Sequence, residues 1–140
     1  MIPINTTLRE KLAELTNCLF WMSESDFPFQ VITWDTNQVT REQLLQLTYH
    51  PPDAPVEVIT VDEFFAPAFS EKEWYGFHER ATLRRYRQLL TFLTYHLSDI
   101  KVYRVGKNTI YVYILGMTRD DNLAGVATKV LETLPQAAKT

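Results

Sequence analysis

The segment from Thr109 to Leu115 constrains the fold more than any other part of the chain. Its side chains alternate between two faces, and both faces are apolar or aromatic. These side chains are Ile110, Tyr111, Val112, Tyr113, Ile114 and Leu115. A strand that meets solvent on one side carries polar residues there, whereas this one does not. The segment is therefore predicted to be a central strand, with a covering layer on each face of its sheet.

A long helix predicted from about Lys72 to Leu97 supplies one of these layers. Apolar side chains recur along it at spacings of three and four residues, so they line one face of a helix. They are Leu83, Tyr86, Leu90, Leu93 and Leu97. Such a stripe requires a sheet or another helix beneath it.

Shorter elements complete the predicted order. Helices are expected over 8–15, capped by Asn5 or Thr6, and from Thr40, which forms a capping box with Gln43. Strands are expected over 29–34, 56–61 and 101–105, with a hairpin turn at 106–108 and a short turn after Asp62. The tail over 123–133 is predicted to be an edge strand, or helix-like near its end.

This order of helices and strands predicts an α/β fold. The expected architecture is an α-β-α layered sandwich with a mixed sheet of about four or five strands. The chain has 140 residues and no repeat or linker, which indicates a single domain over 1–140. Its one cysteine, Cys18, lies among apolar residues and is predicted to be a buried thiol.

Two further expectations concern location. The first residues lack the apolar core and cleavage site of a secretion signal. No window approaches the ~20 apolar residues that a membrane helix needs. We therefore expect a cytoplasmic protein without a membrane partner.

Charge is distributed unevenly along the chain. The stretch 14–79 holds twelve acidic and two basic side chains, a net charge of −10, whereas 80–119 holds eight basic and one acidic side chain, a net charge of +7. An acidic half favours a basic partner, unless folding interleaves the two halves. The overall charge of −3 argues against direct binding of nucleic acid.

Catalytic and metal-binding patterns are largely missing. The histidines His50, His78 and His96 have no metal-ligand spacing, and no phosphate loop, nucleophile elbow or paired-cysteine motif occurs. The turn at 120–122 lacks the glycine and terminal glutamate of a calcium loop. We therefore expect no enzyme activity and no cofactor. Trp74, next to Glu73, instead suits a protein contact, because tryptophan dominates interface hot spots.

The chain resembles the nuclease A inhibitor family of cyanobacteria in a series of ordered blocks. The resemblance runs from about residue 8 to residue 133, and the first and last blocks are the most specific. The blocks are 20–29 with Val31 and Trp34, 53–55, Phe64-Phe65, Trp74-Tyr75, 102–104, 111–113, 122–125, 128–130 and Glu132-Thr133.

This resemblance implies a fold and a function. Family members are α-β-α sandwiches similar to the plant PR-1 fold, and they inhibit a sugar-non-specific endonuclease of the ββα-metal type that uses magnesium. The implied action is stoichiometric, by a monomer that binds one nuclease and occludes its active site. Glu24, between Ser23 and Ser25, is implied to approach the nuclease's magnesium ion, and Glu73 and Trp74 to join the contact surface.

One departure from the family pattern concerns the C-terminus. Family members end at the threonine that corresponds to Thr133, whereas this chain continues through an extension over 134–140. Three alternatives follow: the extension folds aside, Thr140 takes the terminal role, or the protein has another target. The last alternative is a non-inhibitory regulatory or scaffold protein. A small hydrolase that uses Ser23, Glu24 and one of the histidines is a third hypothesis.

Overall fold

The computed structural model describes residues 4–21, 26–70 and 75–131. Four helices and seven strands lie in these ranges. In chain order they are α1 (Ile4–Thr16), β1 (Phe20–Trp21), β2 (Phe27–Pro28), β3 (Gln30–Trp34), α2 (Arg41–Leu47), β4 (Val56–Ile59), α3 (Val61–Phe69), α4 (Phe77–His96), β5 (Ser98–Val105), β6 (Thr109–Met117) and β7 (Leu123–Leu131).

Five strands form one sheet in the order β3-β7-β6-β5-β4, and β1 pairs with β2 in a separate hairpin. Every neighbouring pair in the large sheet is antiparallel, so the predicted mixed sheet was wrong. Strands β5, β6 and β7 follow one another through short turns, which forces them to alternate in direction. Strands β3 and β4 then join opposite edges in the antiparallel sense.

Strand β6 occupies the centre of the sheet, as predicted. The following strand β7 lies between β3 and β6, so the alternative of an edge strand for the tail was wrong. An interior position suits this segment because its residues Leu123, Ala124 and Val126 are buried. The sequence pattern did not reveal that β3, from the N-terminal third of the chain, covers the outer edge of β7.

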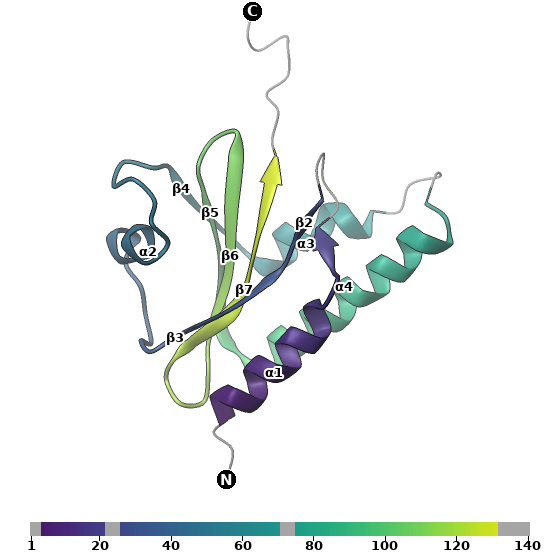
Figure 1. Ribbon diagram of the computed structural model, residues 1–140, viewed down its shortest axis with the longest axis horizontal. Helices are drawn as coiled ribbons and strands as arrows, with labels where there is room; N and C mark the ends of the chain where they lie inside the picture. Colours follow the sequence, from purple (N-terminus) through teal and green to yellow (C-terminus); the bar gives the residue numbers. More distant parts are fainter. Residues whose placement is uncertain (1–3, 22–25, 71–74, 132–140) are drawn as a thin grey trace, which may run out of the picture.

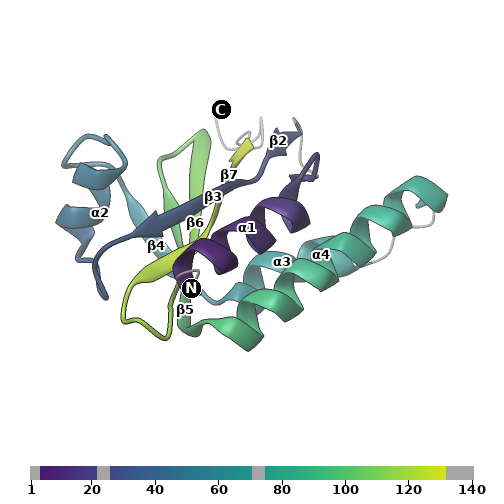
Figure 2. The same ribbon diagram turned by 60° about the horizontal axis from the view of Figure 1, so that its bottom comes forward.

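Helices lie on both faces of the sheet, as Figures 1 and 2 show. α1, α3 and α4 cover one face, where Val112, Ile114 and Val126 join the larger apolar core. The seven-residue helix α2 covers part of the other face, where Leu44 and Leu45 pack against a smaller core. The two-faced pattern of β6 therefore corresponds to two separate cores. None of the helices in the described ranges is long and apolar enough to cross a membrane.

Helix ends mostly follow local capping chemistry. Thr40 and Gln43 form the predicted capping box of α2. A second capping box, made by Thr60 and Glu63, opens α3, so β4 ends before Thr60 and the predicted strand over 56–61 was too long. The turn predicted after Asp62 is part of that helix.

The ends of α1 and α4 differ from the sequence prediction. α1 begins at Ile4, which places Asn5 and Thr6 inside its first turn and not before it. α4 begins at Phe77, after a glycine at its N-cap.

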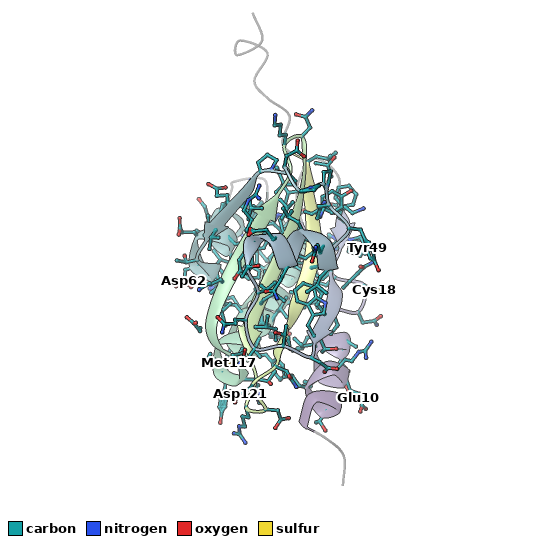
Figure 3. All side chains as sticks on the ribbon, turned by 90° about the vertical axis from the view of Figure 1, so that its left-hand side faces the viewer. Glu10, Cys18, Tyr49, Asp62, Met117 and Asp121 are labelled. Atoms are coloured by element: carbon teal, nitrogen blue, oxygen red, sulfur yellow. The ribbon has the colours of Figure 1, made fainter. Side chains whose placement is uncertain are left out.

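Cys18 is exposed, so the prediction of a buried thiol was wrong. Its backbone has φ 55°, in the left-handed region, within the turn that ends α1. Leu19, the next residue, is buried instead. In Figure 3, Cys18 lies toward the same edge as Glu10 and opposite Asp62. The reversal of the chain at Cys18 turns its side chain away from the core that Leu19 joins.

Gly125 offers a test of the close contact between β6 and β7. A Cβ atom at this position would collide with the backbone carbonyl oxygen of Ile114. We expect Gly125→Ala to lower the free energy of unfolding by more than about 2 kcal/mol, because the paired backbones must separate. Urea unfolding followed by circular dichroism measures this change.

Gly76→Ala is the matched control. Among the described residues, a Cβ atom there meets the Glu79 Oε1 atom alone, at an ordinary 3.5 Å, and we expect a loss below about 1 kcal/mol. Equal losses in the two variants would contradict the proposed backbone contact.

Candidate partner-binding end of the sheet

The side chains implied as partner contacts lie outside the described residues. They are Ser23, Glu24, Ser25, Glu73, Trp74, Thr133 and Thr140. The structure describes the residues on both sides of 22–25 and of 71–74. It also describes β7, the strand that precedes Thr133. These flanking residues define the scaffold from which the implied contacts extend.

The β1–β2 hairpin carries the segment 22–25. Trp21 pairs with Phe27 and Phe20 pairs with Pro28 in the antiparallel register. The amide of Phe29 donates a hydrogen bond to the Leu19 carbonyl oxygen at 3.2 Å, which extends the pairing by one step. The chain therefore enters and leaves this segment through a closed, hydrogen-bonded base.

Trp21, the last described residue before the segment, is buried within an aromatic cluster. Its ring stacks on Phe64 at 4.3 Å between centroids and meets Phe65 edge-on at 5.6 Å, both on α3. Tyr86 of α4 lies 5.1 Å away, and Phe29 meets the ring edge-on at 6.3 Å. Each such pair contributes about 0.5–1.5 kcal/mol beyond burial of its area. The cluster, which we call the Trp21 cluster, fixes the hairpin against two helices.

Two hydroxyl groups hold the hairpin backbone from different sides. The Tyr86 hydroxyl of α4 donates to the carbonyl oxygen of Phe20. The buried Thr128 hydroxyl of β7 lies 3.3 Å from the carbonyl oxygen of Phe27 and 3.1 Å from that of Pro28. Since a hydroxyl has one hydrogen to donate, these two carbonyls share it. Both arms of the hairpin are thereby anchored to the body of the protein.

The end of β7 lies beside this hairpin. The ammonium group of Lys129 lies 5.5 Å from the centre of the Phe27 ring and 5.2 Å from that of Tyr111. A hollow of about 260 Å³ lies here. Its lining residues are Phe27, Pro28, Gln30, Tyr111, Tyr113, Ala127, Thr128 and Lys129. The hairpin base is thus close to the end of β7, two residues before Thr133.

The connection from α3 to α4 carries the segment 71–74. It re-enters the described structure at Tyr75, which is buried in the larger core. The Glu79 carboxylate then accepts a hydrogen bond from the amide of Gly76 at 2.8 Å. This bond lowers the pKa of Glu79, because it stabilises the ionised form. Phe77, the first residue of α4, is 86% exposed.

His50 forms a separate polar contact on the α2 face. Its Nε2 atom lies 2.8 Å from the Tyr113 hydroxyl, and its ring meets Tyr111 edge-on at 4.6 Å. Burial lowers the pKa of His50 and raises that of Tyr113, so both favour their neutral forms. His96, at the end of α4, instead contacts Phe92. Within the described ranges, no three His, Cys, Asp or Glu side chains gather into a potential metal site.

Few direct ion pairs connect the acidic and basic segments within the part of the chain that the structure describes. Among the described residues, the two ion pairs found are Lys11–Glu14 and Glu57–Arg104. Only the second joins the acidic stretch 14–79 to the basic stretch 80–119. Folding also brings the two stretches side by side, since β4 of the acidic stretch pairs with β5 of the basic stretch.

Several residues of this scaffold were not predicted as functional. Thr128 and Lys129 occur in a block of the family resemblance, and Tyr86 belongs to the apolar stripe of the long helix, but no sequence signal linked them to the hairpin. These contacts span 66 residues for Tyr86–Phe20 and 101 for Thr128–Phe27. Only the folded chain brings them together.

Residues 6–133 match the model of a protein family described as nuclease A inhibitor-like protein. The match includes the β1–β2 hairpin, the connection from α3 to α4 and all of β7. It confirms the family resemblance found from the sequence blocks. No curated protein matches the chain.

Thr128→Val tests how β7 anchors the hairpin. The substitution keeps the side-chain shape but removes the hydroxyl that the Phe27 and Pro28 carbonyls share. We expect a loss of about 0.5–1.5 kcal/mol in the free energy of unfolding, because two part-buried carbonyls lose their donor. Faster amide exchange at Phe27 than in the parent protein should accompany it, as hydrogen-exchange NMR measures.

Thr128→Ser, which retains the hydroxyl, should keep the slow exchange at Phe27. If the valine and serine variants exchange equally fast there, the hydroxyl does not anchor the hairpin.

Proposed function

The chain belongs to the nuclease A inhibitor-like family, and on this basis we propose that it is a protein inhibitor of a nuclease. The target in this proposal is a sugar-non-specific endonuclease of the ββα-metal type. The protein binds it stoichiometrically as a monomer, occludes its magnesium site and catalyses no reaction itself. The arrangement of helices on both faces of the sheet is consistent with the PR-1-like fold implied by the family resemblance.

In this proposal Glu24 approaches the magnesium ion of the bound nuclease. A carboxylate is a hard oxygen ligand and can stand where a phosphate oxygen of the substrate would bind. Ser23 and Ser25 flank it with hydroxyl groups that donate or accept hydrogen bonds. The protein needs no metal or cofactor of its own for this action.

The observation that carries the proposal is the rigid base of the β1–β2 hairpin. Trp21 and Phe27 close the segment 22–25, and each is held by a different part of the fold. Fixed flanking residues reduce the conformational entropy that the segment between them has to lose on binding. Such a scaffold supports tight association through a short segment.

Two other segments complete the proposed contact surface. Glu73 and Trp74 precede α4, and the Trp21 cluster joins the hairpin to both α3 and α4. Thr133 follows β7, whose Thr128 binds the hairpin backbone. Trp74 supplies apolar contact that a charged group cannot.

Charge supports the same proposal. The stretch 14–79 carries a net charge of −10. Nucleases that bind DNA and RNA present basic clefts to the phosphate backbone. An acidic surface is steered toward such a cleft, which raises the association rate at low salt.

Glu24→Gln tests the role of the carboxylate in binding. We expect inhibition of a ββα-metal nuclease on plasmid DNA with magnesium to weaken by about 30-fold or more, because loss of a buried interface charge costs ~2–5 kcal/mol. The inhibition constant is measured by titration at fixed nuclease concentration.

Glu42→Gln is the control for Glu24→Gln, since Glu42 is an exposed side chain in the first turn of α2. It removes the same charge outside the proposed contact surface and should leave inhibition unchanged. Equal inhibition by the parent protein and Glu24→Gln would remove Glu24 from the mechanism. Absence of inhibition by the parent protein at large excess would favour the regulatory or scaffold alternative.

Truncation after Thr133 tests the C-terminal extension. It restores a terminal carboxylate next to the Thr133 hydroxyl, and a charge-assisted hydrogen bond contributes about 1.5–3 kcal/mol. We therefore expect inhibition to strengthen by about tenfold or more in the same titration.

Thr140→Ala in the full-length chain separates the remaining alternatives. If truncation and Thr140→Ala both weaken inhibition, Thr140 has the terminal role. If neither changes it, the C-terminus takes no part in binding.

A further inference from the structure

A groove runs between α1 and α4, on the helices that cover the larger core. Two adjoining hollows, of about 730 and 440 Å³, share Lys11, Phe92 and His96 and so form one continuous depression. The first extends toward Leu15 and Arg87. The second extends toward Leu8 and Arg119.

The walls of this groove are held in place. The guanidinium group of Arg85 on α4 donates to the carbonyl oxygens of Leu15 at 3.0 Å and Asn17 at 2.8 Å, which caps the end of α1. Leu8 and Leu12 of α1 are buried in the core that α4 also joins. The groove is therefore a fixed feature between two packed helices.

The length of the groove follows from its two walls. Thr7 to Leu15 on α1 spans about 12 Å, and Arg87 to His96 on α4 spans about 14 Å, at 1.5 Å per helical residue. This length equals about two to three turns of an α-helix. A third helix laid along the groove presents side chains at spacings of three and four residues to it.

The groove has an apolar and aromatic part beside its threonine and glutamine side chains. Phe92 and Leu15 are half-buried, and Phe92 contacts the His96 ring at 4.2 Å. The Tyr95 ring lies 4.8 Å from the His96 ring, so the three rings form a row, and Tyr95 is 74% exposed. A row of partly exposed rings along one helix is a surface that gains stability when apolar side chains cover it.

The charged groups of the groove are basic. Lys11, Arg87 and Arg119 line it, and no Asp or Glu is among the lining residues. Lys11 forms an exposed pair with Glu14 at 3.5 Å, which contributes little, and Arg87 lies 4.5 Å from the centre of the Phe69 ring. The groove thus combines this apolar part with positive charge along its length.

We propose that this groove is a docking site for an acidic amphipathic helix of a partner protein. The apolar face of that helix covers Phe92 and Leu15, and its carboxylates pair with Lys11, Arg87 and Arg119. Single-stranded nucleic acid fits less well, because the His96 ring is already in contact with Phe92 and Tyr95. Phe92 is half-buried, and the exposed rings of Tyr95 and His96 contact each other, which leaves few free faces for bases to stack on.

A peptide titration tests this site on the full-length protein. The probe is a fluorescein-labelled 14-residue helix with leucines at spacings of three and four and glutamates elsewhere. We expect micromolar binding by fluorescence anisotropy, weakened by added salt because charged contacts are screened. The same peptide with lysine in place of every glutamate should not bind.

Variants of the groove locate the contact. Arg87→Glu, Arg119→Glu and Tyr95→Ala should each weaken binding of the acidic peptide by about tenfold or more, because exposed side chains at the contact are lost or reversed. Arg80→Glu and Phe77→Ala are matched controls on α4, since neither residue lines the groove. They should bind as the parent protein does, and circular dichroism verifies that every variant is folded.

The outcomes separate this proposal from the proposed function. Absence of peptide binding, binding unaffected by the groove variants, or preference for a labelled oligothymidine probe would each overturn the docking site. The groove variants are also titrated against the nuclease. Unchanged inhibition together with lost peptide binding identifies a second partner site.

Discussion

The packing of Trp21 against Phe64 joins two segments that lie far apart in the sequence. Through this stack and the neighbouring contact with Tyr86, one ring links the β1–β2 hairpin to α3 and α4. Burial of a large aromatic side chain contributes several kcal/mol, and its flat shape restricts how the partners can be oriented. The position of the hairpin, and with it the base of the segment 22–25, depends on this contact.

The central strand β6 supports both the hairpin and the groove through the larger of the cores on its two faces. Its two apolar faces create two cores, and the larger one holds α1 together with α3 and α4, the two helices that brace the hairpin. The same three-helix layer also forms the groove between α1 and α4. The hairpin and the groove thus share one support but involve different side chains, so the two proposed contact sites do not compete for the same residues.

The parts of the fold that were predicted correctly depend on residues close in sequence. The capping box at Thr40, the hairpin after Val105 and the long amphipathic helix follow from local spacing and from chain geometry. The antiparallel order of the sheet, the interior place of β7 and the exposure of Cys18 were missed. Strand order depends on pairings between distant segments, and the direction of Cys18 depends on a single left-handed residue.

The sequence by itself determined that β6 is covered on both faces, that one acidic and one basic stretch follow each other, and which family the blocks resemble. These properties lie in residue type, alternation and order along the chain. Only the tertiary structure decided that Thr128 and Tyr86 hold opposite arms of one hairpin, and that Lys11, Phe92 and Arg119 line one groove. These groups become neighbours when the apolar core is buried. The hydrophobic effect that drives this burial is non-directional, so no local sequence pattern shows which polar groups will meet.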